Sequence, residues 1–380
     1  MLKIIILFFL FAGICFYLSH RIHKGIVAFF PKIKLWQIIL IISTVALLLL
    51  LSFVRGTMPV PTGIKIFLGI VNAVCMGFML YLFLYTLLAD ALILIPRLLK
   101  LAFTKHRLFN GFVTLSVLFL TLVTCIGGFI NFQRIEHVSY EIKLEGKQDI
   151  SDLKLVMISD LHLGSMGSEG RLEEIVSEIN AQHPDIVCVA GDFFDTVFSY
   201  INDPDAAIKT LQKIDSTYGV YACLGNHDGG ETHNQMVDFL KNANITLLKD
   251  EYTVIDERLI LIGRLDASSI GGYGDQKRQE LSSFFTRTDP TVPVIVLDHN
   301  PAYIDEYTTE ADLILCGHTH KGQVFPGSII TELMYDVDYG YYQKDASSPQ
   351  VIVSSGIGAW GMPIRVGTDN EIVSISFSCN

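Results

Sequence analysis

Hydrophobic and polar positions divide the chain into two stretches with different periodicity. Up to residue 131, apolar residues form four segments of 17 to 24 residues with few interruptions. From residue 136 onward, short apolar runs alternate with polar loops and with helical spacing. Segments of the first kind can cross about 30 Å of hydrocarbon as helices, and short runs predict buried strands. We therefore expect an all-α transmembrane region over 1–135 and an α/β domain over 136–380.

The four apolar segments predict four transmembrane helices. They cover about 2–18, 36–54, 66–89 and 109–131. A signal peptide is the alternative for the first segment, but no small-x-small cleavage site follows it. A bundle of buried soluble helices is the alternative for all four, and it does not explain apolar segments of this length. The expected organisation is a multi-pass membrane anchor.

Loop charges predict the orientation of this anchor. Two loops are rich in Lys and Arg, and one is poor. The rich loops carry Arg21, Lys24, Lys32 and Lys34, and Arg97, Lys100, Lys105 and Arg107; the poor loop carries Arg55 and Lys65. Basic loops stay in the cytoplasm. We therefore expect both rich loops to be cytoplasmic and the domain after residue 131 to be extracytoplasmic.

The remainder of the chain is acidic. Residues 136–380 contain 38 Asp or Glu and 16 Lys or Arg, a balance of −22. Such a balance repels polyanions, and no run of Lys or Arg marks a nucleic-acid groove, so no nucleic-acid partner is expected. The seven Cys show no disulfide or zinc spacing, which favours free thiols.

In the second stretch, helices alternate with strands first, and strands then follow alone. Helical spacing of apolar residues predicts helices over 169–179, 205–214 and 232–242. The expected strands are 140–144, 154–159, 186–190, 220–224, 245–248, 252–255, 259–262, 294–298, 313–316, 350–353 and 371–377. This order predicts an α/β fold in which a pair of mixed sheets has helices outside.

Polar side chains follow five of these strands. They are Asp160, His162, Asp192, Asn226, His299, His318 and His320. Ligands bind at the carboxyl ends of strands in open α/β sheets, so we expect one convergent site. Seven donors are too many for one ion and suit two ions that share a bridging carboxylate. Imidazole with carboxylate favours manganese, iron or zinc over calcium. His227, beside Asn226, is a candidate general acid.

The order of these motifs carries a resemblance to a known family. Over residues 154–377, Asp-x-His, Gly-Asp, Gly-Asn-His-Asp, His-x-Pro and Gly-His-x-His resemble the calcineurin-like metallophosphoesterases, in particular the bacterial membrane-anchored branch. The resemblance implies a double β-sandwich flanked by helices that hydrolyses phosphate esters, phosphodiesters or pyrophosphates. In place of Gly-x-Asp-Asp and Gly-Gly-Gln, frequent in that branch, this chain has Gly263-Arg264-Leu265-Asp266 and Lys321-Gly322-Gln323.

The resemblance also implies a role for each donor. Asp160, His162 and His320 would hold a first divalent metal ion. Asn226, His299 and His318 would hold a second. Asp192 would bridge the two ions, and His227 would be the acid.

The sequence allows two interpretations for several other residues. Asp195 and Asp228 either orient ligands or cap turns. A group of aromatic and basic residues lines a substrate groove or a half-buried strand face: Tyr339, Tyr341, Tyr342, Trp360 and Arg365. The remaining histidines are expected at interfaces or on the surface: His20, His23, His106, His137, His183 and His233.

Three functions remain open. The first is a membrane-anchored phosphoesterase with two divalent metals that acts outside the cytoplasm on a phosphate ester, such as a lipid head group or an envelope polymer, next to membrane lipids. The second keeps the metals but places the domain in the cytoplasm, acting on nucleotides or nucleic acid. The third is a non-catalytic membrane sensor, which predicts damaged metal positions, and none is damaged here.

Overall fold

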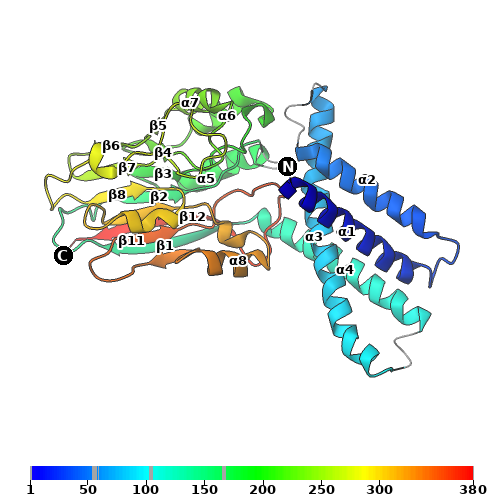
Figure 1. Ribbon diagram of the computed structural model, residues 1–380. Coiled ribbons are helices and arrows are strands. Elements are labelled where there is room, and N and C mark those ends of the chain that lie inside the picture. Colours follow the sequence, from blue (N-terminus) through cyan, green and yellow to red (C-terminus); the bar gives the residue numbers. More distant parts are fainter. Residues whose placement is uncertain (1, 54–57, 59, 102–105, 165–167, 380) are drawn as a thin grey trace. The chain divides into compact units, whose positions relative to one another are not determined.

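The computed structural model describes residues 2–53, 58, 60–101, 106–164 and 168–379. The chain divides into two compact units, Met1–Phe129 and Ile130–Asn380 (Figure 1). Arg55 and Lys105, which enter the comparison of loop charges, lie outside the described residues.

The first unit consists of long apolar helices. They are α1 (Leu2–Ile26), α2 (Leu35–Phe53), α3 (Thr62–Leu98) and α4 (Arg107–Phe132), whose last three residues belong to the second unit. All four are long and apolar enough to cross a membrane. Large side chains such as Phe119 and Leu92 are exposed on them, as lipid-facing residues are. The unit therefore has the composition of a membrane-spanning region.

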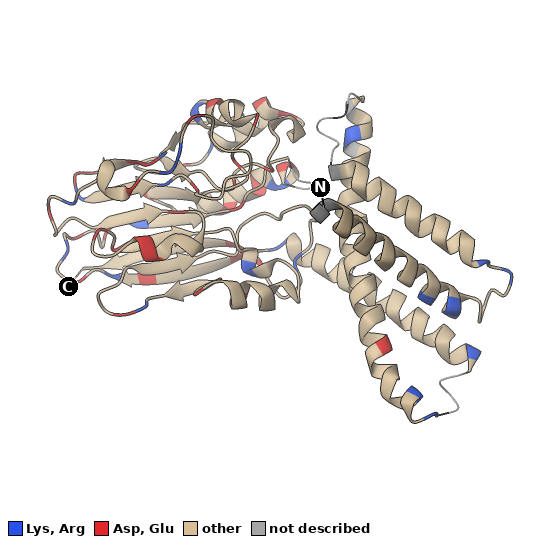
Figure 2. Ribbon diagram, in the orientation of Figure 1, with Lys and Arg blue, Asp and Glu red and all other residues tan. Residues whose placement is uncertain are grey.

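The third helix is longer than the apolar segment that predicts it. It continues to Leu98, so Asp90 lies in a helix rather than in a loop. Asp90 forms an ion pair with Arg21 of α1 and accepts a hydrogen bond of 2.8 Å from the Tyr17 hydroxyl. Figure 2 shows most Lys and Arg of this unit gathered where α1 leads into α2 and α3 leads into α4.

The second unit contains two six-stranded mixed sheets. The first has the order β1 (Ile135–Lys143), β12 (Asn370–Ser378), β2 (Lys154–Ile158), β3 (Ile186–Ala190), β4 (Val220–Cys223), β5 (Ile245–Leu247). The second has the order β10 (Gly340–Tyr342), β11 (Gln350–Val353), β9 (Leu313–Cys316), β8 (Val294–Leu297), β7 (Leu259–Gly263), β6 (Glu251–Ile255). The pair of sheets confirms the predicted β-sandwich.

Strand periodicity explains how the layers form. Successive residues of a strand point to opposite faces, and both faces are covered here, so the runs are apolar throughout. Leu155 and Met157 pack between the sheets against residues such as Leu261 and Leu315. Val156 and Ile158, on the alternate positions, pack outward against helices. Free buried thiols fill the same strands at Cys188, Cys223 and Cys316.

Three helices cover the outer face of the first sheet. They are α5 (Leu172–Ala181), α6 (Pro204–Leu211) and α7 (His233–Asn242), and Figure 1 shows them on the side of β3 and β4. Leu172, Ile175 and Ile179 recur at helical spacing and pack on Val156 and Val187. A further helix, α8 (Gly327–Met334), and strand β10 were not predicted from the sequence.

Candidate metal centre

The seven predicted donors come from neighbouring strand ends in both sheets. In the first sheet β2, β3 and β4 are parallel neighbours, and in the second β8 and β9 are. Parallel neighbours end at the same edge, so the loops that follow them converge. They carry Asp160 and His162 after β2, Asp192 after β3, Asn226 after β4, His299 after β8, and His318 and His320 after β9.

One group of three donors gathers around a single point. His162 Nε2 and His320 Nε2 are 3.1 Å apart, and His320 Nε2 is 3.3 Å from Asp160 Oδ1. All three side chains are buried. They form a cluster whose ligand atoms lie within 4.8 Å of one another.

A second group lies beside the first. His299 Nε2 is 3.3 Å from His318 Nδ1, which is 2.8 Å from Asn226 Oδ1. Asp192 lies between the two groups, because its Oδ2 is 3.2 Å from His299 Nε2 and 3.8 Å from His162 Nε2. The structure thus brings all seven predicted donors into one double cluster.

Glycines in the loops make this convergence possible. A Cβ on Gly225 would lie 2.2 Å from Asp192 Oδ1, and a Cβ on Gly317 would lie 2.4 Å from Asp160 Oδ2. Distances under 3 Å do not occur for real Cβ atoms. The glycine that follows one strand therefore makes room for the carboxylate that follows its neighbour.

The donor loops are also strained. Five donors have positive φ angles although none is glycine: Asp160, His162, Asp192, His318 and His320. Each such residue costs on the order of 1–3 kcal/mol, and such residues cluster at functional sites. The fold holds these side chains in place against their backbone preferences.

The electrostatics of the buried donors suit metal ions. Burial lowers the pKa of His162 to about 3 and the pKa of His318 to about 4, so both rings are neutral at pH 7. Burial acts to raise the pKa of Asp192, but nearby His299 outweighs it and the pKa falls below its ordinary value. Burial raises the pKa of Asp160 to about 6. Burial acts to lower the pKa of His299, but the Asp192 carboxylate outweighs it and raises that pKa well above its ordinary value. Imidazoles and carboxylates that converge in the interior are the donors that manganese, iron and zinc prefer.

Asp228 supports the centre without joining it. It is fully buried, and its carboxylate accepts hydrogen bonds from the backbone N–H groups of Gly225, Phe193 and Phe194 at 2.8 to 3.2 Å. These bonds tie the loop of Asn226 to the loop of Asp192. His233 is buried behind it, with Nδ1 3.0 Å from the Asp228 carbonyl, which corrects its expected surface position.

His227 stands at the edge of the centre. Its backbone N–H donates to Asp192 Oδ1 at 2.8 Å, and its Nδ1 lies 2.6 Å from the Thr196 hydroxyl. Thr196 has a φ of +63° in a turn closed by a 2.7 Å bond from Val197 N–H to the Asp195 carbonyl. The exposed ring of Trp360 lies 6.2 Å from that of His227. Sequence reasoning missed Thr196, because a lone threonine in a loop carries no periodic signal.

The other singled-out residues divide between two places. Arg365 is buried rather than in a groove, and it donates to the carbonyl oxygens of His320, at 3.1 Å, and Gly358. Asp195 Oδ1 lies 3.9 Å from His162 Nδ1. Tyr341 lies at the amino ends of β9 and β11, away from the metal centre, and lines a groove of about 610 Å³ there.

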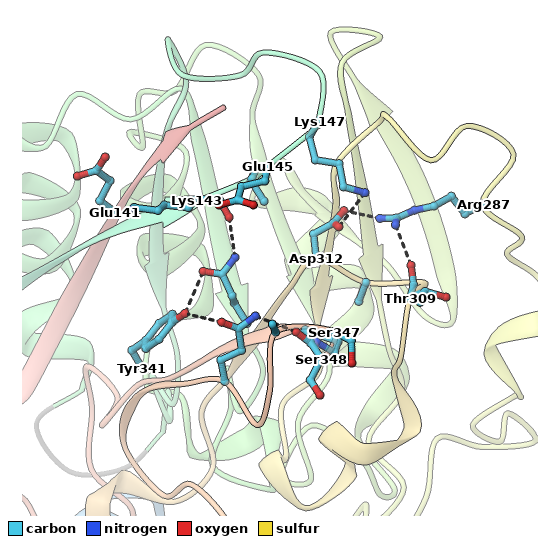
Figure 3. Close-up of a pocket in the computed structure, with 16 residues that line it drawn as sticks. Glu141, Lys143, Glu145, Lys147, Arg287, Thr309, Asp312, Tyr341, Ser347 and Ser348 are labelled. Atoms are coloured by element: carbon cyan, nitrogen blue, oxygen red, sulfur yellow. Dashed lines mark hydrogen bonds and ion pairs between the residues drawn. The ribbon is translucent and has the colours of Figure 1, made fainter. Parts of the chain in front are cut away.

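That groove is not a second charged site. Figure 3 shows the ends of Lys147 and Arg287 both directed toward Asp312. Lys147 Nζ lies 2.9 Å from Asp312 Oδ1, and Arg287 pairs with the other oxygen and donates to the Thr309 carbonyl at 2.7 Å. The whole lining of the groove carries three Lys or Arg and three Asp or Glu, so its formal charges balance: Lys143, Lys147, Arg287, Glu141, Glu145 and Asp312.

Comparison with known proteins places the chain in a family. Residues 153–322 match the calcineurin-like phosphoesterases. An uncharacterised metallophosphoesterase of Aquifex aeolicus is 30% identical over 246 residues, which cover 64% of this chain and 92% of that protein. The chain belongs to the calcineurin-like metallophosphoesterases. The pair of mixed sheets and the clustered Asp and His side chains of this metallophosphoesterase agree with that membership.

Two other relatives of this metallophosphoesterase differ in what their names say. A transmembrane protein with metallophosphoesterase domain from Danio rerio is 30% identical over 69% of this chain and 62% of its own length. The UDP-2,3-diacylglucosamine pyrophosphatase LpxG of Chlamydia trachomatis is 24% identical over 55% of this chain and 78% of its own length. The chain spans 58% of the length of its Helicobacter pylori relatives.

Proposed function

We propose that this chain is a membrane-anchored phosphoesterase that uses two divalent metal ions to hydrolyse a phosphate ester, phosphodiester or pyrophosphate bond of a lipid or envelope substrate. One observation carries the proposal. Asp192 Oδ2 lies within 4 Å of a ring nitrogen from each of two separate donor groups. A carboxylate so placed would bridge two ions if each donor group held one.

Each donor then has a role. Asp160, His162 and His320 would hold the first ion, and Asn226, His299 and His318 would hold the second. When bound, such a pair of ions would activate a water molecule and stabilise the charge that develops in phosphoryl transfer. The chain's own residues keep these donors fixed, because Asp228 ties their loops together and Arg365 holds the main chain at His320.

His227 protonates the leaving group in this scheme. His227 Nδ1 lies 2.6 Å from the Thr196 hydroxyl. In the imidazolium form, Nδ1–H would donate to that hydroxyl and Nε2–H would protonate the departing oxygen, which leaves a neutral imidazole. The hydrogen bond from the His227 backbone N–H to Asp192 Oδ1 holds His227 beside the carboxylate of Asp192.

The membrane anchor and one relative support the choice of substrate. Four apolar helices hold the catalytic unit at a membrane, and Lys and Arg at the two interhelical connections favour an extracytoplasmic catalytic unit. LpxG, by its name, is a pyrophosphatase of UDP-2,3-diacylglucosamine, a molecule with two acyl chains. A phosphate ester or pyrophosphate on a lipid is thus the substrate class that fits both facts.

The test uses the full chain in detergent. Metal content is measured by mass spectrometry after loading with manganese, iron or zinc, and hydrolysis is measured on a monoester, a diester, a pyrophosphate and a lipid pyrophosphate. We expect about two ions per chain and turnover that Asp192→Ala abolishes and that Asp238→Asn, on the exposed surface of α7, retains. A folded chain that takes up no transition metal, or that loads with metal and cleaves none of these substrates, contradicts the proposal. Protease protection in intact cells tests the side of the membrane separately.

A further inference from the structure

Helix α8 has an inverted amphipathic arrangement. Its apolar residues Ile329, Ile330, Leu333 and Met334 are exposed, Leu333 by 83%. Its polar residue Thr331 faces the domain instead, and the hydroxyl donates to Asp338 Oδ2 at 2.7 Å. A surface helix of a soluble domain places these two faces the other way round.

Backbone contacts at its amino end join α8 to the rest of the domain. Phe325, 51% exposed, precedes the helix, and its N–H donates to the Val366 carbonyl at 2.8 Å. Gly322 packs so closely that a Cβ there would lie 2.1 Å from Ser328 N. None of the eight residues of α8 is buried, although a helix this short is not stable alone. An exposed apolar patch of this kind marks an interaction site.

The patch borders the metal centre. Tyr335, which directly follows α8, has its ring 6.1 Å from the ring of His318. Gln323 lies between His320 and α8, and its side-chain amide bonds the N–H and carbonyl of Trp360 at 2.9 and 3.0 Å. Trp360 is in turn the exposed ring beside His227. An apolar partner of α8 would therefore lie next to the metal centre.

The chain itself points to a lipid bilayer as that partner. Two residues separate the end of α4 at Phe132 from the start of β1 at Ile135. Within the second unit, the Asn131 amide donates to the Thr368 carbonyl at 2.8 Å, which fixes the end of this apolar helix to the loop that carries Arg365. Glu332 is the one charged residue of α8, so apolar contact rather than charge defines the partner.

We propose that α8 and Phe325 lie in the interfacial layer of the bilayer and receive the acyl chains of a lipid whose phosphate enters the metal centre. The contact of α8 with the bilayer depends only on the membrane anchor. The acceptance of a lipid's acyl chains rests on the proposed function. Helices that lie in the interface bury their apolar face about 5–10 Å into the head-group boundary. Because the contact is apolar, it persists in zwitterionic lipid and at high salt.

The contact is tested with a single tryptophan reporter. The chain has two tryptophans, Trp36 and Trp360, and both are replaced by phenylalanine. Leu333→Trp then reports from α8, and Val254→Trp, at a 51% exposed position on β6, is the matched control. In phosphatidylcholine vesicles that contain the full chain, brominated lipid quenches the reporter on α8 about twofold and the control little, as an interfacial depth requires. Equal quenching of the two reporters overturns the proposal.

The lipid substrate is tested by a pair of assays on Ile330→Glu/Leu333→Glu. Both positions are exposed, so folding is retained, and Val254→Glu is the control. Hydrolysis of phosphatidic acid and of diacylglycerol pyrophosphate in nanodiscs falls at least tenfold, and hydrolysis of water-soluble bis-p-nitrophenyl phosphate is unchanged. Quenching without any lipid hydrolysis retains the bilayer contact and overturns the lipid substrate. Loss of all hydrolysis in the metal-loaded parent chain refutes the proposed function and leaves the quenching result intact. A change in oligomeric state in place of quenching identifies a second copy as the partner and overturns the proposal.

Discussion

Gly225→Ala is the substitution that tests the metal centre most directly. The added Cβ would lie 2.2 Å from Asp192 Oδ1 and 2.3 Å from the Asp192 backbone nitrogen. An ordinary contact needs a separation about 1 Å larger, and the backbone atom cannot rotate away as a side chain can. The loop of Asp192 must therefore move. Overpacking of this kind costs about 1–3 kcal/mol of stability, and a displacement of about 1 Å costs about 100-fold in turnover.

The assay measures three quantities on the full chain in detergent: bound metal, thermal midpoint and hydrolysis of bis-p-nitrophenyl phosphate. We expect Gly225→Ala to lose metal and turnover together while the chain remains folded. Gly170→Ala is the matched control, since a Cβ at Gly170 meets nothing within 4 Å and its φ is not positive. Full metal occupancy and full turnover in Gly225→Ala would refute the reasoning that Asp192 bridges the two ions at this distance.

Three further outcomes follow from the same geometry. Thr196→Val removes the 2.6 Å bond to His227 Nδ1, so turnover of alkyl phosphates falls about tenfold. Turnover of p-nitrophenyl esters is retained, because their leaving group needs no acid. Thr196→Ser restores the turnover of alkyl phosphates, and an equal loss on both substrates would exclude acid catalysis by His227. Burial raises the pKa of Asp160 to about 6, so this carboxyl is protonated below pH 6 in the metal-free chain. The affinity for manganese, measured by titration, therefore falls at least tenfold from pH 7 to pH 5. A pH-independent affinity would show that Asp160 is not a metal ligand. Arg365→Lys loses the fork that holds the His320 and Gly358 carbonyls, so metal affinity falls at least tenfold, whereas Arg258→Lys, an exposed ion pair, leaves it unchanged.

The sequence predicts the strands and the donors for one physical reason. A strand covered on both faces is apolar along its whole length, so its end is visible as the first polar residue. Asp160, Asp192 and His299 each stand two residues after the end of such a strand. The parallel pairing of those strands then brings their ends together without further information.

Other features of the centre depend on loop geometry that no periodicity reveals. Thr196 reaches His227 only because its turn has a positive φ. Arg365 reaches His320 through a loop 45 residues further along the chain. The short helix α8 was missed because its polar face is turned inward, and α3 was underestimated because Asp90, paired with Arg21, interrupts the apolar run without ending the helix.

The strand ends and the surrounding loops have different roles: the strand ends position the metal donors, and the loops contact what approaches them. The strained backbone of the donors destabilises the fold. Burial of both faces of the neighbouring strands offsets this free energy, so the sheets set the positions of the donors. Trp360 and α8 are exposed and lie in the segments that surround the donors, so they do not contribute to the buried core that positions the donors. Changes there alter what reaches the metal centre without altering the centre. Under the proposed function, substrate choice therefore belongs to the segment from Phe325 to Tyr335 and to Trp360, where substitutions are expected to change the preference between a lipid and a soluble ester.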